Sequence, residues 1–318
     1  MSDNKIKVVS LAGPTASGKT ALSVMLAHRF NGEIVSADSM QIYKGMDIAT
    51  AKPTKEEMCS IRHHLMDYVE VTESYSVARY IEDAKVAIAD IHKRNKLPII
   101  TGGTGLYIDS LLSGVSFSEG EADISLRQEL QHRLEAEGID AMLSLLSEFD
   151  RDSAQRLSVE RNPKRIIRAI EVYYTTGVTM TEQNLRSKVN GSDYLPVKLA
   201  LNFRDRQKLY DRINLRVDLM LEQGLLKEAE HHFSCNHANT SVQAIGYKEL
   251  KPYFDGALSL NECIEILKRS TRRYAKRQLT WFMRDNQIKW FYVDDYNNSN
   301  MLFEAVSEYL IQEGFEVE

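Results

Sequence analysis

Short apolar segments alternate with amphipathic segments over the first third of the chain. Three apolar segments, residues 6–11, 33–37 and 97–101, are predicted to be buried strands. Amphipathic segments at about residues 19–30 and 76–95 are predicted to be helices. Strands that alternate with helices at this spacing favour a parallel sheet with covering helices.

The pattern changes at Ser116, where a polar segment that contains glycine begins. From there to about Leu185 the chain is helical in pattern, with no clear strand. A loop-forming segment follows at residues 187–196, and strand character returns at residues 197–203. These changes indicate a helical segment inserted into an α/β core.

The C-terminal part adds helices and one strand-like run at residues 288–293. We therefore predict an α/β fold with a central, mostly parallel sheet and an all-helical insertion subdomain. The core is expected to comprise residues 1–116 and 195–318, and the insertion residues 117–194.

The composition is that of an ordinary globular protein and excludes several classes. Of the 318 residues, 43% are hydrophobic and 27% charged, with 40 Lys and Arg against 45 Asp and Glu. The net charge of −5 excludes a uniformly basic protein that coats nucleic acid. No apolar run approaches the ~18 residues of a membrane span. Nothing in the pattern requires an oligomer, so a monomer without a membrane partner is expected.

The cysteines argue against two kinds of cross-link. Cys59, Cys235 and Cys263 are widely spaced and form no C-x-x-C pair, which disfavours a disulfide framework and a zinc site. The His63-His64 pair has no metal-ligand spacing with nearby Cys or carboxylates, which favours a structural role. A reducing, cytoplasmic setting is expected.

Residues 13–20, GPTASGKT, match the phosphate-loop pattern G-x-x-x-x-G-K-[ST]. The match lies between a predicted strand and a predicted helix, which is the context that the mechanism needs. Backbone N–H groups would converge on phosphate oxygens, Lys19 would neutralise charge, and the Thr20 hydroxyl would hold Mg²⁺. The sequence therefore predicts a core that resembles the P-loop NTPases.

Two features expected of nucleotide hydrolases are missing. The strand at residues 97–101 runs into Gly102-Gly103-Thr104-Gly105 where an NTPase would place a Mg²⁺-associated Asp. Residues 95–98, NKLP, lack the Asp of an N-K-x-D element. Together these departures suggest that the loop holds a diphosphate without hydrolysing a nucleotide.

Asp38 and Thr104 each follow a predicted strand directly. In an open parallel sheet both would lie at the carboxyl edge, beside the phosphate loop, where such folds bind ligands. Asp38 is thus a candidate general base, and a turn or N-cap role is the alternative. Thr104 could reach the same crevice, with a helix cap as the alternative.

Arg216 can be placed by helical geometry. Leu209, Ile213, Val217 and Met220 form the apolar stripe of one predicted helix, and Arg216 falls about 60° from its centre. A guanidinium at the edge of a buried face needs an anion. The candidates are a diphosphate, which Arg216 could clamp through two hydrogen bonds, and an internal carboxylate.

Two basic stretches stand out against the acidic average. The first runs from residue 268 to 284 with no acidic residue and carries seven cations: Lys268, Arg269, Arg272, Arg273, Lys276, Arg277 and Arg284. The second lies near a helix start in the insertion: Arg161, Lys164, Arg165 and Arg168. A positive helix start opposes the helix dipole, which favours an external polyanion, with a solvated helix face as the alternative. The two stretches together suggest a cleft for RNA.

Seven blocks occur in the order found in the tRNA dimethylallyltransferases, also called tRNA isopentenyltransferases. They are GPTASGKT, VSADSMQIYKGMDIATAKP, HHLMDYVE, GGTGLYIDSLL, RINLRVDLMLEQGLL, QAIGYKEL and KRQLTWFMR. The sequence resembles the bacterial type of this family from about residue 6 to 293. The resemblance implies transfer of a dimethylallyl group from dimethylallyl diphosphate to N6 of the adenosine 3′ of the tRNA anticodon, with release of diphosphate.

The resemblance also implies roles for particular residues. Asp38 matches the family's general base, Thr104 the residue near the bridging oxygen of the donor, and Arg216 the diphosphate clamp, while Mg²⁺ is expected near Thr20. Donor binding is implied for Gly13, Thr15, Ala16, Ser17, Gly18, Lys19 and Thr20. Contact with the anticodon stem-loop of tRNA is implied for Asp38, Ser39, Met40, Gln41, Lys164, Arg165, Ile166, Ile167, Arg168, Gln243, Ala244, Ile245, Gly246, Tyr247, Lys248, Lys276, Arg277, Gln278, Trp281 and Arg284.

Two positions depart from the family's pattern, Ala49 where glycine is common and Met283 before an arginine, and both concern local loop geometry. Three other functions remain open. A P-loop kinase would turn over ATP, an adenylate isopentenyltransferase would act on free nucleotides, and a nucleotide-switched RNA-binding protein would consume no donor. The adenylate isopentenyltransferase would share the core with a tRNA-modifying enzyme, and the RNA-binding protein would share the RNA surface. Analysis of the reaction product distinguishes each of them from a tRNA-modifying enzyme.

Overall fold

The computed structural model describes most of the chain in two compact units. One unit comprises Met1–Leu111 and Asp193–Glu318, and the other Leu112–Ser192. The described residues are 5–114, 124–189, 192–234, 241 and 244–317. The polar segment expected from Ser116 and part of the loop expected at residues 187–196 lie outside them.

A six-stranded sheet in the order β3-β2-β4-β1-β5-β6 forms the centre of the larger unit. Every strand pair in it is parallel, which confirms the predicted α/β class. The strands are β1 (Ile6–Ala12), β2 (Gly32–Ser36), β3 (His63–His64), β4 (Leu97–Thr101), β5 (Tyr194–Asn202) and β6 (Lys289–Tyr292). Only β3 was not predicted, because two residues are too short for a hydrophobic period.

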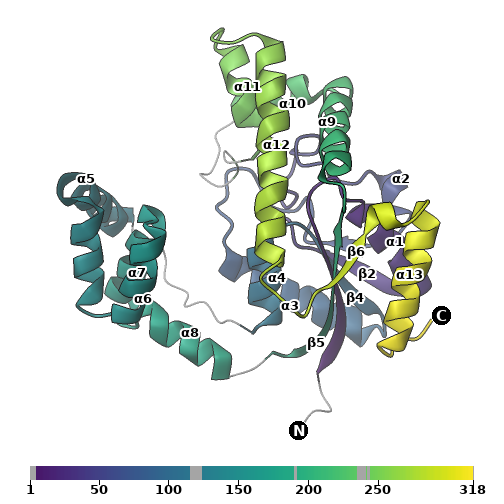
Figure 1. The fold of residues 1–318 in the computed structure, drawn as a ribbon, viewed down its shortest axis with the longest axis horizontal. Coiled ribbons are helices and arrows are strands. Elements are labelled where there is room, and N and C mark those ends of the chain that lie inside the picture. The colour runs from purple at the N-terminus through teal and green to yellow at the C-terminus, as the bar shows by residue number, and fades with distance from the viewer. Residues whose placement is uncertain (1–4, 115–123, 190–191, 235–240, 242–243, 318) are drawn as a thin grey trace. The chain divides into compact units, whose positions relative to one another are not determined.

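Helices cover both faces of this sheet, as continuous apolar strands require. α1 (Lys19–Arg29) and α13 (Ser299–Gln312) lie on one side, and α3 (Val77–Lys93) lies on the other (Figure 1). Apolar residues of β1, β2, β4 and β5 form one core with those of α1 and α13. The carboxyl ends of the strands remain free for the loops that carry the candidate residues.

A second group of helices follows β5. α9 (Arg206–Glu222) packs against the long α12 (Leu260–Phe282), and α10 (Leu225–Ser234) and α11 (Tyr247–Phe254) adjoin them (Figure 1). Leu209, Ile213 and Val217 of α9 are buried, as the helical period predicts. Among the described residues, the remaining helices are α2 (Lys55–Met58), α4 (Gly105–Leu112), which ends at the unit boundary, and the 3₁₀ helix η2 (Val293–Asp295).

In the described part of the smaller unit, every secondary-structure element is a helix. These helices are α5 (Ile124–Ser147), α6 (Arg151–Glu160), α7 (Pro163–Thr176) and α8 (Met180–Val189). Their apolar faces form a separate core that includes Leu130, Met142, Leu146 and Leu157. Across the described part of the chain, no helix has the length and apolar character needed to cross a bilayer.

Candidate active site

The loop between β1 and α1 has the strand, turn and helix order of a phosphate loop. Gly13 has a φ of +140°, and a Cβ there would lie 2.8 Å from the carbonyl oxygen of Leu201. Gly18 has a φ of +94° and precedes the first residue of α1. The first N–H groups of a helix have no intrahelical partner, so this loop can bind an anion.

Lys19 is the first residue of α1, directly after the loop. Its Nζ donates to the carbonyl oxygen of Pro14 at 2.6 Å. Burial, reinforced by the nearby Arg216 and opposed by Asp38, lowers the pKa of Lys19 to about 7. A diphosphate beside Lys19 would favour its charged form and raise this pKa.

Arg216 approaches the same loop from α9. Its Nη1 donates to the Thr15 hydroxyl oxygen at 3.2 Å, and burial lowers the pKa of its guanidinium. Within the described ranges, Arg216 forms no ion pair with a carboxylate. The internal partner considered as the alternative is therefore not found there. Arg212, which the sequence did not single out, donates from Nε to the carbonyl oxygen of Ala16 at 2.9 Å.

Asp38 follows β2 and forms a tight turn. Its Oδ1 accepts hydrogen bonds from the backbone N–H groups of Met40 (2.9 Å) and Gln41 (3.4 Å), and neither bond uses Oδ2. Burial raises the pKa of Asp38, although these backbone bonds and Lys19 oppose the shift. The turn role and the base role are thus compatible, since they use different oxygens.

One cavity of about 260 Å³ brings the main candidates together within the α/β unit. Asp38 and Arg216 line it with Thr15, Lys19 and Thr20 of the phosphate loop. A carboxylate whose pKa is raised therefore shares a cavity with two desolvated cations. This combination suits a reaction that removes a proton and releases an anion within one cavity.

Thr104 is adjacent to this cavity but is not among the residues that line it. Its Oγ1 accepts a hydrogen bond from the backbone N–H of Ser39 at 3.0 Å, and its own N–H donates to the Ala37 carbonyl at 3.1 Å. Its carbonyl accepts from N–H groups in the first turn of α4. These contacts hold the Asp38 turn, so a direct contact of Thr104 with a donor stays a prediction.

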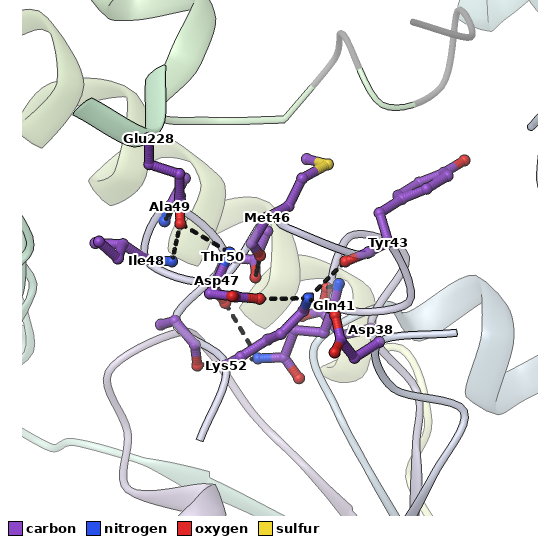
Figure 2. Close-up of polar contacts among 12 residues, drawn as sticks. Asp38, Gln41, Tyr43, Met46, Asp47, Ile48, Ala49, Thr50, Lys52 and Glu228 are labelled. Carbon is purple, nitrogen blue, oxygen red and sulfur yellow. Dashed lines mark hydrogen bonds and ion pairs between the residues drawn. The ribbon is translucent and has the colours of Figure 1, made fainter. Parts of the chain in front are cut away.

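Internal bonds hold the loop that follows Asp38. The Gln41 side-chain amide donates to the carbonyl oxygens of Thr50 and Ala51, both at 3.1 Å. The buried Lys52 donates to the Tyr43 carbonyl at 2.5 Å and to Asp47 at 2.6 Å (Figure 2). The Gln41 amide therefore braces the loop, and contact of Gln41 with tRNA stays a prediction.

Glu228 on α10 is the residue of this region that the sequence missed. Its carboxylate accepts hydrogen bonds from three consecutive backbone N–H groups, those of Asp47 (3.0 Å), Ile48 (2.8 Å) and Ala49 (2.9 Å) (Figure 2). It also accepts one from the Tyr247 hydroxyl at 2.8 Å. Ala49 has no positive φ, so alanine is tolerated where glycine is common. Met283 likewise has an ordinary helical φ of −66° at the end of α12.

The QAIGYK block reaches the cavity through four residues, Ala244, Ile245, Gly246 and Lys248. Gln243 lies outside the described residues. Tyr247 is buried against Glu228, so its side chain supports the loop and is not available to an RNA. A Cβ on Gly246 would lie 2.9 Å from that of Ala49, so the two blocks meet closely.

The basic stretch at 268–284 forms a cationic face on and just after α12. Lys268 pairs with Asp218 at 2.7 Å, and Arg272 donates to the Asn214 side chain at 2.6 Å, so these two turn toward α9. The other five are exposed and form no ion pair within the described residues: Arg269, Arg273, Lys276, Arg277 and Arg284. We call these five residues the α12 cationic face.

Gln278 and Trp281 of this segment form hydrogen bonds with other parts of the protein. Gln278 is buried, and its amide contacts the phosphate loop and Gly103. Trp281 donates from Nε1 to Asp109 Oδ2 at 2.5 Å. Tyr274, which was not a candidate from sequence, lines the cavity, and burial raises its pKa while its hydroxyl bonds to Thr104 and Gln278.

Three of the four cations of the second basic cluster form ion pairs within the helical unit. Arg161 pairs with Asp140 at 2.8 Å, Arg165 with Glu160, and Arg168 with the buried Glu171 at 2.9 Å. These ion pairs weaken the helix-dipole argument, but Glu160 and Glu171 each also pair with a second arginine, Arg156 and Arg127, so contact with an external polyanion stays a prediction. Lys164 is exposed.

Ile166 and Ile167 lie in the same block but are only 0% and 7% exposed. Both belong to the core of the helical unit. Their side chains cannot touch an RNA without unfolding α7, so the expected tRNA contact is corrected to a packing role.

Comparisons with known proteins identify relatives over nearly the whole chain. A family model described as IPP transferase matches residues 41–285. A tRNA dimethylallyltransferase of Caldanaerobacter subterraneus is 47% identical over 308 residues, which cover 96% of this chain and 98% of the relative. One of Bacillus licheniformis is 49% identical over 292 residues, which cover 92% of each chain.

Two solved structures are also similar to this chain over 97% of its length. A full-length tRNA isopentenylpyrophosphate transferase from Bacillus halodurans is similar with a TM-score of 0.72 and 42% identity, over 97% of this chain and 96% of the other. A eukaryotic dimethylallyltransferase acting on tRNA has a TM-score of 0.80 and 31% identity, over 97% of this chain and 80% of the other.

Proposed function

The chain belongs to the IPP transferase family and is a transferase that modifies tRNA, and we propose the substrates and residues through which it acts. It transfers the dimethylallyl group of dimethylallyl diphosphate to N6 of the adenosine 3′ of the anticodon. The observation that carries this proposal is the shared cavity of Asp38, Lys19 and Arg216. It offers a base and an anion site without the Mg²⁺-associated Asp of a nucleotide hydrolase.

The proposed reaction uses the carboxylate and the two cations that line the cavity. The adenine N6 attacks C1 of the dimethylallyl group, the C1–O bond breaks, and its electron pair leaves with diphosphate. An exocyclic adenine amine is a poor nucleophile because its lone pair is delocalised, so Asp38 accepts its proton as the C–N bond forms. Lys19 and Arg216 stabilise the negative charge that accumulates on the leaving group.

Mg²⁺ fits this site only together with the donor. No group of three or more His, Cys, Asp or Glu side chains among the described residues could hold a metal ion. Thr20 nevertheless lines the cavity, and a single hydroxyl suffices where phosphate oxygens and waters supply the other ligands. Thr20 would hold the ion, which would supply further neutralisation of the diphosphate when bound.

The tRNA is expected to bind the α12 cationic face, and Arg277 of that face also lines the cavity. The target adenosine must leave its stack to reach Asp38, as in other base-modifying enzymes. Exposed cations of the helical unit, including Lys164, are expected to add contacts to the RNA backbone. The decisive assay is incubation with dimethylallyl diphosphate, Mg²⁺ and unmodified tRNA, followed by nucleoside analysis. Absence of N6-dimethylallyladenosine, with ATP consumed instead, would favour the kinase alternative.

Removal of two cations from the α12 cationic face should weaken tRNA binding without affecting the donor. For the Arg273→Ala, Lys276→Ala double variant we expect an increase of about tenfold in the tRNA Kd. The slope of log Kd against log salt should fall by about 1.5, because two phosphate contacts are lost. Fluorescence anisotropy over a salt series measures both values. The Lys5→Ala, Lys93→Ala double variant, which removes two exposed cations elsewhere, is the charge-matched control, and an equal effect of that variant would contradict a local RNA surface.

The pH dependence should show two limbs with different causes. Burial raises the pKa of Asp38, so kcat/KM should fall toward acid at a higher pH than for an ordinary Asp. Deprotonation of Lys19, whose pKa is about 7, should lower kcat/KM for the donor on the alkaline side. Bound diphosphate raises this pKa, so the alkaline limb should shift upward in the kcat profile. An alkaline limb at the same pH in both profiles would exclude Lys19 as its source.

A further inference from the structure

Gln278 lies at the point where three segments meet. It is 5% exposed on α12, its Oε1 accepts a hydrogen bond from the Thr15 N–H at 2.9 Å, and its Nε2 donates to the Gly103 carbonyl at 3.0 Å. A backbone N–H can only donate and a carbonyl can only accept, so the two partners fix the orientation of the amide. One side chain thus joins the phosphate loop to the turn after β4.

Two glycines after β4 let α12 pack closely against this turn. A Cβ on Gly103 would lie 2.0 Å from Nε2 of Gln278, and one on Gly105 would lie 2.2 Å from the Trp281 ring. The glycines therefore allow α12 to approach the turn closely along one face of the helix. Since Trp281 also bonds to Asp109, the helix is fixed to α4 next to Gln278.

The other partner of Gln278 is part of the anion site. Gln278 holds the backbone of Thr15, and Arg216 holds the hydroxyl of the same residue at 3.2 Å. Thr15 is thus bonded from α12 on one side and from α9 on the other. A change at Gln278 would therefore alter the position of the loop and of the guanidinium that contacts it.

We propose that Gln278, although it lines the cavity, is a positioning residue for the diphosphate of the donor, because its amide is engaged by Thr15 and Gly103 and is not needed to bind the RNA. The inference rests on the proposed function for the identity of the donor. It divides α12 into two faces with separate substrates. The cationic face binds RNA, and the buried face, through Gln278, sets the conformation of the phosphate loop. Substitutions on the cationic face should then weaken binding of tRNA, whereas substitutions of Gln278 should weaken binding of diphosphate.

The test uses binding of inorganic diphosphate with Mg²⁺ to the full chain, without tRNA, by calorimetry. Gln278→Met keeps the length of the side chain but forms neither bond, and we expect its diphosphate Kd to rise about tenfold because the loop is misplaced. Gln278→Glu keeps an acceptor, loses the bond to Gly103 and adds negative charge near the anion, so its Kd should rise further. The tRNA Kd of both variants should stay within about twofold of that of the parent chain.

Lys276→Ala, two residues away on the cationic face, should show the reverse pattern, with weaker tRNA binding and unchanged diphosphate binding. Thermal unfolding of each variant separates loop effects from loss of fold, and Gln278→Glu provides a second variant if the methionine form does not fold. An unchanged diphosphate Kd with a raised tRNA Kd in the Gln278 variants would overturn the proposal. Diphosphate binding needs no prenyl transfer, so failure of the proposed function leaves this result interpretable.

Discussion

Asp38→Asn lowers kcat by about 10²–10⁴-fold while the protein still binds both substrates. The expected loss is large because asparagine cannot accept the N6 proton. Its side-chain oxygen can still accept from the N–H groups of Met40 and Gln41, which bond to Asp38 Oδ1 at 2.9 and 3.4 Å. Single-turnover rates with saturating donor and tRNA measure the chemical step directly.

Two further measurements make this prediction specific to the proton transfer. The acid limb of the pH profile should disappear from the residual activity of Asp38→Asn, because the group that titrates has been removed. Asp90→Asn, which changes an exposed carboxylate on α3, should leave turnover unchanged. Near-normal single-turnover rates for Asp38→Asn would return Asp38 to a turn-forming role.

The parts of the site that the sequence predicts depend on short-range patterns. The phosphate loop is one contiguous motif, and Asp38 directly follows a strand whose apolar character is plain. Arg216 follows from the helical period of its own helix, which the burial of Ile213 and Val217 confirms. In each case the chemistry of a residue and its placement are encoded within one or two turns of the chain.

The parts that the sequence does not predict depend on distant partners. Glu228 bonds to N–H groups about 180 positions earlier, and Gln278 to Thr15 across 263 positions. Nothing local distinguishes Glu228 from an ordinary solvated glutamate, or Gln278 from its polar neighbours. Their roles appear only when the sheet brings the loops together.

The basic cluster at residues 161–168 shows what a local charge pattern leaves out. The charge run alone does not show that Arg161 pairs with Asp140 or that Arg168 pairs with Glu171, because those carboxylates lie outside the run. On α12, five of the seven cations form no ion pair within the described residues, so the charge run there leaves a cationic surface. Charge runs therefore indicate an RNA surface only after internal pairing is known.

Arg216→Met should separate the demands of function from those of stability. Removal of a buried cation that has no carboxylate partner within the described residues relieves a desolvation cost, so the ligand-free protein should gain about 2 °C in Tm. The same change removes a charge that stabilises the leaving diphosphate, and kcat should fall by about 10²–10³-fold. Thermal unfolding and single-turnover kinetics measure the two effects.

When diphosphate is present, Arg216→Met should no longer have a higher Tm than the parent chain. Binding to the folded state stabilises by RT ln(1 + [L]/Kd), so a weaker Kd reduces the rise in Tm that saturating diphosphate gives the parent chain. Arg206→Met, at the exposed start of α9, is the matched control and should change neither the ligand-free Tm nor the diphosphate-induced shift. If Arg216→Met instead lowered the ligand-free Tm and left the shift intact, Arg216 would be a structural residue. A stable but inactive variant is expected, because this guanidinium is held in the cavity for an anion that the protein itself does not supply.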